Sequence, residues 1–289
     1  MIKKHNIVLY ILLFIEILLF INSKYIIKNV IATSKLFFYY IFPSMVTTMF
    51  FSKLLILNDL KKIIPKSIKY IFNKLFNFND DLTTLYITSM ICASPTNAVL
   101  IKDYLDKDII NEKQAEILLG TTTFINPLFI ISTVGIYIFN NIKVGYLLLS
   151  LLYLSSAIKL FINRKYFKNI NNIKIYKKDS FISSVYNSIN TVSNSLITIF
   201  IIIIIFNIIS SLLISLFDSK KLFSTIIKII LEITSGIINI KYLNIDNELK
   251  ILICYFALNF GGICIHMQNL SLINNKKISY LKYLIFRIL

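Results

Sequence analysis

The chain has 289 residues, of which 56% are hydrophobic and 16% charged, and its mean hydropathy is +0.73. A water-soluble globular protein is excluded, because its folded surface would need many more polar side chains. The net charge of +17 resides mostly in Lys and Arg residues of short loops between apolar runs, which is typical of a membrane protein and not of a nucleic-acid-binding one. We therefore predict an all-α, multi-pass protein of the cell membrane, with the lipid bilayer as a partner and no nucleic acid.

Eight apolar segments are the candidate membrane helices, because about 20 helical residues cross the ~30 Å hydrocarbon core. In chain order they are 7–21, 30–51, 82–101, 117–139, 144–162, 196–217, 226–240 and 251–273. The first follows Lys3 and Lys4 like a signal peptide, but no convincing cleavage site comes after it, so we expect an uncleaved helix. The sequence thus predicts a single membrane domain, 1–289, built as a helical bundle with six to eight membrane segments.

Two of these segments, 82–101 and 226–240, contain polar residues that ordinary spans lack, and we predict that both are re-entrant or broken. If all eight segments cross, the Lys and Arg residues of the loops divide almost evenly between the two sides. If these two enter and leave on the same side, most of the positive residues lie on one side. Because short loops rich in Lys and Arg stay cytoplasmic, we favour six full spans, two re-entrant segments and both termini in the cytoplasm.

The chain divides into two similar halves, each with a long helix, a broken polar segment and a further helix. We assign 1–29 to a first helix and loop, 30–139 to the first half, 140–179 to a connecting helix and basic loop, and 180–289 to the second half. With two re-entrant segments the halves have opposite orientations, which is the inverted repeat of many secondary transporters. The alternative is that any chain of apolar helices can be divided into similar halves.

Segment 61–78 has apolar residues at helical spacing, with its Lys residues off that stripe. We expect this helix to lie in the cytoplasmic membrane interface, where anionic lipid headgroups attract its Lys residues. Docking of a protein partner is the alternative role.

Gly and Pro are scarce, with six and four in the chain, so their positions inside apolar segments indicate deliberate helix breaks. The first break contains Ser94, Pro95, Thr96 and Asn97. Its exposed peptide groups either bind a solute or form a loop at the membrane edge. The second break, Asn126 and Pro127, is a kink that either contacts a solute or only shapes the packing.

The third break contains Glu232, Thr234 and Gly236, and Glu232 is the carboxylate of the second half at membrane depth. A charge at the bilayer centre costs about 2.5–3.5 kcal/mol, so this group must be paired, protonated or in contact with water. Either Glu232 pairs with Lys228 one turn away, or it couples a proton or cation, or it lies at the interface. Glu16 raises the same question outside both halves.

The fourth break contains Gly261, Gly262, His266 and Gln268, a combination that suits either tight helix packing or a solute cavity. His266 is either a bundle residue with satisfied hydrogen bonds or a pH-sensitive group. The three cysteines, Cys92, Cys254 and Cys264, lie in apolar sequence without metal-ligand spacing. No catalytic residues can be assembled, so we expect no enzyme activity, no metal and no cofactor.

These motifs, in this order, resemble those of the YlbJ-type sporulation integral membrane proteins in the nucleoside-recognition or Gate-domain group. The resemblance covers about residues 35–283. The matching residues are Phe42 and Pro43, Pro95 and Ala98, 126–130 with 133–135, Leu231, Glu232, Thr234 and Gly236, and 260–262 with Gln268. This sequence departs from the family pattern at Cys92, Ala93, Ser94, Asn97 and Val99.

The resemblance implies a role in endospore formation, at the spore envelope or cortex, with sporulation membrane proteins as partners. It also implies a membrane fold like that of nucleoside-transporter Gate domains. We therefore expect a transporter or permease of a small polar solute whose identity the sequence does not give. The alternative is a non-transporting membrane scaffold for a sporulation envelope complex.

Overall fold

The computed structural model describes residues 4–58, 60–92, 94–168, 170, 180–216, 221–273 and 278–288. Within these ranges the protein is all-helical and has no strand, which confirms the predicted fold class. In the same ranges four helical stretches are long and apolar enough to cross a membrane. They are Ser23–Leu57, Ile142–Phe167, Phe181–Ser215 and Asn247–Ile273. The expectation of membrane-spanning helices is therefore confirmed, while the count of six to eight segments stays a prediction.

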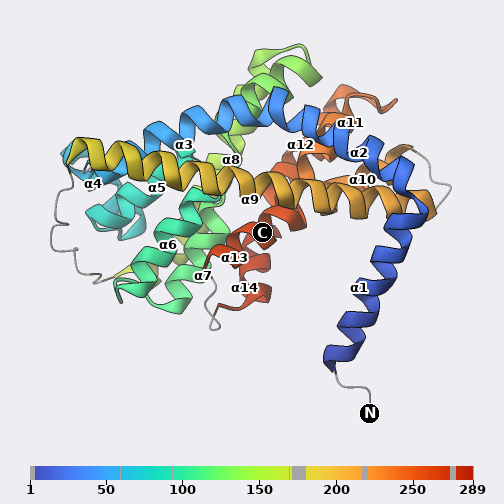
Figure 1. Ribbon diagram of the computed structural model, residues 1–289. Helices are drawn as coiled ribbons and strands as arrows, with labels where there is room; N and C mark the ends of the chain where they lie inside the picture. Colours follow the sequence, from blue (N-terminus) through green and yellow to red (C-terminus); the bar gives the residue numbers. More distant parts are fainter. Residues whose placement is uncertain are drawn as a thin grey trace.

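Two long helical rods lie side by side across the molecule (Figure 1). The first rod consists of α2 (Ser23–Leu36), the π-helical turn η1 (Phe37–Ile41) and α3 (Phe42–Leu57), and the second is α9 (Phe181–Leu216). The helix α1 (Lys4–Ile21) projects away from the bundle in Figure 1 and packs mainly on α2.

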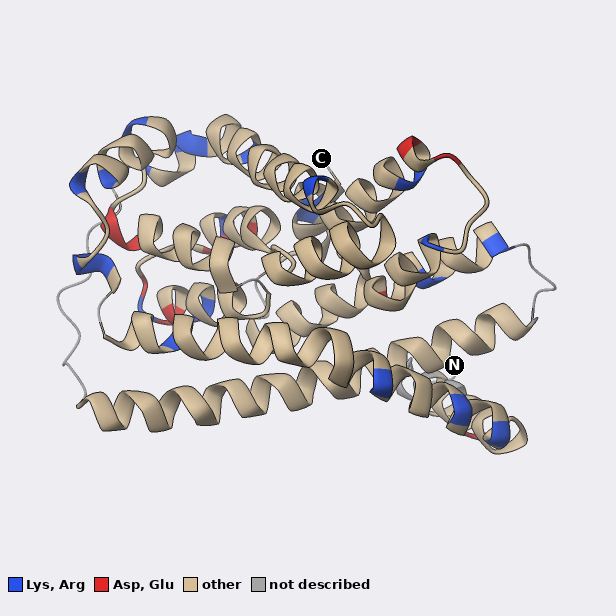
Figure 2. Cartoon of the chain, turned by 90° about the horizontal axis from the view of Figure 1, so that it is seen from above, with Lys and Arg blue, Asp and Glu red and all other residues tan. Residues whose placement is uncertain are grey.

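Helix α9 begins well before the predicted segment 196–217, in a stretch rich in Ser, Thr and Asn. Hydroxyl groups there donate to carbonyls four residues back, as Ser188 does to Ser184 at 2.7 Å and Thr191 to Asn187 at 2.7 Å. These bonds satisfy the polar side chains inside the helix itself, so the polar stretch continues the helix and does not end it. Helix α9 contains no charged residue (Figure 2).

Four pairs of shorter helices, each interrupted by a break, fill the space beside the two rods. The pairs are α5 (Asp80–Cys92) with α6 (Thr96–Asp106), α7 (Glu112–Thr122) with the π-helix η3 (Phe129–Ile138), α10 (Lys221–Leu231) with α11 (Ile233–Ile240), and α12 (Asn247–Phe260) with α13 (Gly262–Ile273). The order of one rod followed by two broken pairs therefore occurs twice along the chain.

Each break has a local cause that the sequence motifs anticipate. Pro95 precedes α6, and Asn126 and Pro127 precede the first turn of η3. Glu232 is the N-cap of α11. Gly261 ends α12 with φ of +88°, a left-handed conformation that residues with a Cβ atom adopt at a cost.

Two of the pairs fold back on themselves as helical hairpins. In α5–α6 the Tyr104 hydroxyl near the end of α6 donates to the Asp81 carbonyl near the start of α5 at 3.2 Å. In α10–α11 the α-carbon of Gly236 packs on the backbone of Ile229, across the turn at Glu232. The pairs that fold back are the two that contain the predicted re-entrant segments.

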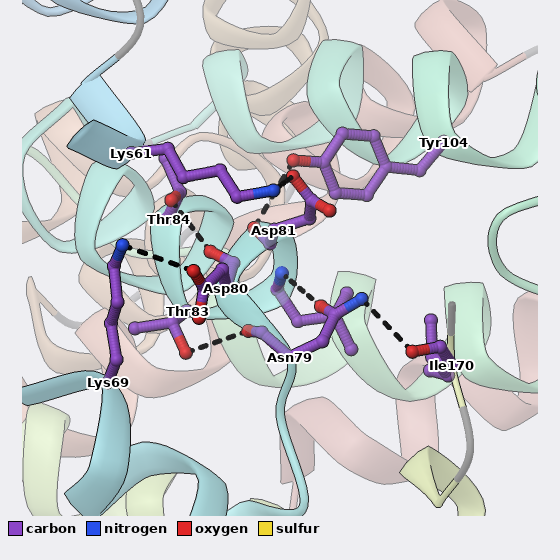
Figure 3. A network of polar contacts seen from close by, with 10 residues as sticks. Lys61, Lys69, Asn79, Asp80, Asp81, Thr83, Thr84, Tyr104 and Ile170 are labelled. Atoms are coloured by element: carbon purple, nitrogen blue, oxygen red, sulfur yellow. Dashed lines mark hydrogen bonds and ion pairs between the residues drawn. The ribbon is translucent and has the colours of Figure 1, made fainter. Parts of the chain in front are cut away.

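Ion pairs tie the base of the α5–α6 hairpin to the basic segment before it (Figure 3). That segment consists of the 3-10 turn η2 (Leu60–Lys62) and α4 (Lys66–Phe76). Lys61 contacts Asp81 at 2.8 Å, and Lys69 contacts Asp80 at 3.1 Å. The side chain of Asn79 donates to the Ile170 carbonyl at 3.3 Å, which holds the chain at Ile170 against the same corner.

The remaining helices pack on the second broken pair, α7–η3. Helix α8 (Ile142–Asn163), continued by the short turn η4 (Arg164–Phe167), packs on η3, where Gly135 and Gly145 allow the backbones to approach closely. Helix α14 (Tyr280–Ile288) packs on α7, and Gly120 leaves room there for Phe286. The C-terminal helix thus reaches the interior of the bundle.

Candidate functional site

A cavity of about 60 Å³ lies where the four helix breaks approach one another. Its polar lining residues come from the four broken pairs: Ser94, Asn126, Glu232, Thr234 and Gln268. Its apolar walls come mainly from the two long rods, the second break and α13. The structure therefore brings together residues from each of the four motifs found in the sequence.

The cavity lies at the middle of the two longest spans. Ile41 is next to the midpoint of the span Ser23–Leu57, and Ile199 is next to the midpoint of the span Phe181–Ser215, and both side chains line the cavity. If these rods cross the bilayer, the cavity is near its midplane, where helical interruptions are tolerated only beside protein or water. We call it the midplane cavity.

Glu232 is the buried N-cap residue of α11, at the turn between α10 and α11. It is 0% exposed, and its two carboxylate oxygens accept the backbone N–H groups of Thr234 and Ser235, each at 2.8 Å. The N-terminus of a helix has a positive partial charge, so this position stabilises a carboxylate. Within the described residues no ion pair joins Glu232 to Lys228, so the local pair that the sequence allowed does not form here.

Asn126 links the second break to the first rod. Its side-chain oxygen accepts the Leu128 backbone N–H at 2.9 Å, and its amide nitrogen donates to the Thr48 hydroxyl at 2.7 Å and the Ser44 carbonyl at 3.2 Å. The amide group thus already has three hydrogen bonds inside the protein. Asn126 shapes the cavity wall and holds α3 against η3.

Gln268 and Thr234 differ from Glu232 and Asn126, because their side chains line the cavity without a hydrogen bond to any described residue. Gln268 is only 4% exposed, so its amide can find partners only in the cavity itself. These two groups are the ones most available to a ligand or to water.

A hydrogen-bonded network fixes the first break against the second. The Ser94 hydroxyl donates to the Asn269 side-chain oxygen at 2.7 Å, and the Asn269 amide donates to the Thr123 hydroxyl at 3.1 Å. The Asn97 amide donates to the same Thr123 hydroxyl at 3.0 Å, and the Ser94 backbone N–H donates to the Phe124 carbonyl at 2.8 Å. The tip of the α5–α6 hairpin is therefore held in place by α7 and α13.

Eight of the predicted site residues do not line the midplane cavity: Pro95, Thr96, Asn97, Pro127, Gly236, Gly261, Gly262 and His266. These residues lie at the breaks themselves or on the helices that follow them. His266 is 0% exposed, and its ring contacts the Phe260 carbonyl at 2.8 Å and the Tyr280 hydroxyl at 3.1 Å. Both ring nitrogens thus have partners, as in a bundle histidine with satisfied hydrogen bonds.

Two further residues take part in this region although the sequence motifs did not name them, Thr123 and Arg287, and they are joined by Asn269, a polar residue of the fourth motif. Asn269 is next to Gln268, so its position on α13 was a usable signal. Nothing local indicated Arg287, because it lies near the end of the chain and reaches the breaks only through the packing of α14. Among the described residues, no group of three His, Cys, Asp or Glu side chains is arranged to hold a metal ion.

Comparisons with protein-family models, with curated proteins and with solved structures found no match to this chain.

Proposed function

We propose that this protein is a multi-pass membrane permease for a small polar solute, which binds in the midplane cavity. The observation that carries the proposal is the set of unused polar groups there: the Gln268 amide and the Thr234 hydroxyl, next to the capped carboxylate of Glu232. Such groups at the meeting point of interrupted helices are typical of transport sites.

The lining of the cavity favours a particular class of solute. Glu232 is its one charged lining residue among those described, and a carboxylate with two hydrogen bonds can still accept further ones. The solute is therefore a cation or a neutral molecule with hydrogen-bond donors, such as an amine, amide or polyol. A cavity of about 60 Å³ is well below the ~150 Å³ of an engineered site that binds benzene, so the solute has few heavy atoms in this conformation.

Opposite insertion of the two hairpins belongs to the same proposal. The broken pair α7–η3 extends from Gln114 to Tyr137. Gln114 donates to the Tyr166 carbonyl at 2.6 Å, and the Tyr137 hydroxyl is 3.4 Å from that of Tyr242. The open end of α5–α6 lies at the Tyr166 side, since Asn79 bonds Ile170. The open end of α10–α11 lies at the Tyr242 side. This arrangement supports an inverted repeat with two re-entrant hairpins.

The cellular role is proposed on the motif resemblance alone: endospore formation, in the cell membrane, beside other sporulation membrane proteins. The alternative role is a non-transporting scaffold for a sporulation envelope complex. It differs from a permease in needing no solute in the midplane cavity.

The test is transport by the full-length protein reconstituted into proteoliposomes, measured with a panel of small amines, amides and polyols. We expect flux of at least one solute, and at least a tenfold loss of it in both Gln268→Leu and Glu232→Gln. The matched controls are Met267→Leu, an exposed neighbour on α13, and Glu248→Gln, an exposed carboxylate on α12. Both controls should transport like the unmodified protein.

Two outcomes would count against the permease. One is the absence of flux and of solute-induced thermal stabilisation for every member of the panel. The other is normal spore maturation in cells that carry Glu232→Gln and Gln268→Leu at ordinary protein abundance, which would favour the scaffold.

A further inference from the structure

A second small pocket, separate from the midplane cavity, is lined by two buried basic side chains, Lys159 and Arg287. Lys159 is 7% exposed and Arg287 is 4% exposed. The pocket has a volume of about 10 Å³, and its other polar lining residues are Thr121, Thr123, Ser156 and Asn259. It shares only Phe124 and Ile125 with the midplane cavity.

Arg287 has its charge compensated by backbone groups. Its guanidinium donates to the Thr123 carbonyl at 2.7 Å, the Phe260 carbonyl at 3.2 Å and the Leu258 carbonyl at 3.5 Å. These carbonyls lie at the C-terminal ends of α7 and α12, where the helix dipoles place negative partial charge. Two interrupted helices therefore neutralise one arginine.

Lys159 lacks comparable compensation. Its ammonium group has three donors, and its one hydrogen bond in the described structure goes to the side-chain oxygen of Asn259 at 3.2 Å. Within the described residues no carboxylate lies within 4.0 Å of it. The three buried acidic residues there have other partners, namely Asp81 with Lys61, Glu116 with Lys282, and Glu232 with backbone amides.

We propose that Lys159 and Arg287 form a binding site for one monatomic anion of halide size. A buried charge in a membrane protein needs a counter-charge or equivalent dipoles, and Lys159 is the group without them. The pocket volume of about 10 Å³ is at the lower limit for one water molecule, roughly 10–15 Å³. A halide is larger than water, so it enters only with a small outward displacement of the lining side chains, whereas phosphate and other polyatomic oxyanions would need a much larger one. A water molecule would satisfy donors of Lys159 but would leave its charge uncompensated.

The direct test is diffraction from crystals of the full-length protein grown or soaked in bromide. We expect an anomalous peak in the pocket within about 3.5 Å of the Lys159 ammonium nitrogen, longer than the ~2.7–2.9 Å of a charge-assisted contact to oxygen because a halide has the larger radius. This measurement needs no variant, so it is decisive even if substitutions at Lys159 prevent folding. The absence of a peak in this pocket would overturn the proposal.

The second test is thermal unfolding of the purified protein at constant ionic strength, with chloride or bromide replacing gluconate. At a tenfold excess of halide over its Kd we expect the Tm to rise by about 3 °C. The rise should vanish in Lys159→Met and Lys159→Gln. It should persist in Lys143→Met, which removes an exposed lysine from the same helix, α8.

Three results of the thermal test would overturn the site. One is a Tm that does not depend on halide, as expected for a trapped water or a neutral amine. Another is an equal rise in Lys159→Met, which indicates a general salt effect. The third is stabilisation by phosphate or sulfate but not by halide. None of these measurements involves transport, so they are independent of the permease proposal.

Discussion

Gly236 lies against the backbone of Ile229, so close that a Cβ atom at Gly236 would be 2.5 Å from the Ile229 nitrogen and 2.7 Å from its α-carbon. This contact closes the α10–α11 hairpin around Glu232. The absence of a side chain at Gly236 is therefore what allows the chain to reverse direction within one residue.

Gly236→Ala is expected to lower the free energy of unfolding by about 1–3 kcal/mol, because the added methyl group overpacks the hairpin. Thermal unfolding in detergent checks the loss. Since the clash is with backbone atoms, adding Ile229→Ala should restore less than half of the lost stability. Full restoration by that second substitution would contradict the backbone contact.

Asn269→Leu is expected to destabilise the junction between the first and second breaks by about 1–3 kcal/mol. The substitution removes the bonds to Ser94 at 2.7 Å and to Thr123 at 3.1 Å and leaves the buried Ser94 hydroxyl without its acceptor, while the Thr123 hydroxyl keeps Asn97. Unfolding measurements on Asn269→Leu and on the exposed control Met267→Leu check this prediction. Equal stability of the two variants would show that the network contributes little.

Arg287→Met is expected to destabilise the bundle more than an exposed substitution, because it leaves the Thr123 carbonyl without this donor and the Phe260 carbonyl with His266 alone. Arg287→Lys should not restore stability, since one ammonium group cannot reproduce the planar fork that reaches three carbonyls. Size-exclusion chromatography and Tm of the two variants check this. Wild-type behaviour of Arg287→Lys would mean that charge alone suffices.

Asp81→Asn and Asp80→Asn provide a matched pair at the base of the α5–α6 hairpin (Figure 3). The side chain of Asp81 is 7% exposed and that of Asp80 is 40% exposed. Loss of the buried charge pair with Lys61 is expected to cost about 1–3 kcal/mol, and loss of the exposed pair with Lys69 less than about 1 kcal/mol. Unfolding at low and high salt checks the ranking, and a reversed ranking would refute the role of Asp81.

Cysteine labelling tests the orientation of the hairpins, on a background without Cys92, Cys254 and Cys264. Probes at Lys66 and Lys107 are expected to react from the same, cytoplasmic side, because the base of the hairpin lies beside the basic segment. A probe at Lys143 should react from the opposite side. Labelling of Lys107 together with Lys143 would exclude the re-entrant arrangement. A third probe, at Lys174 in the basic loop, is expected to react from the cytoplasmic side as well, and this position lies outside the described residues.

The sequence by itself determined the helical membrane character and the places where helices break. Both depend on local chemistry: apolar runs long enough for a bilayer give spans, and Pro95, Pro127, Gly261 and the cap residue Glu232 interrupt helices wherever the chain places them. The start of α9 was missed, because Ser and Thr residues that suggest a loop instead bonded carbonyls within the helix.

Only the tertiary structure decided which breaks meet and what each polar group does there. It gave Glu232 two backbone amides and not Lys228, committed the Asn126 amide to α3, and left Gln268 unused in the cavity. It also brought Arg287 from the last helix to the ends of α7 and α12. These outcomes depend on contacts between residues far apart in the chain, and a local pattern contains no information about such distances.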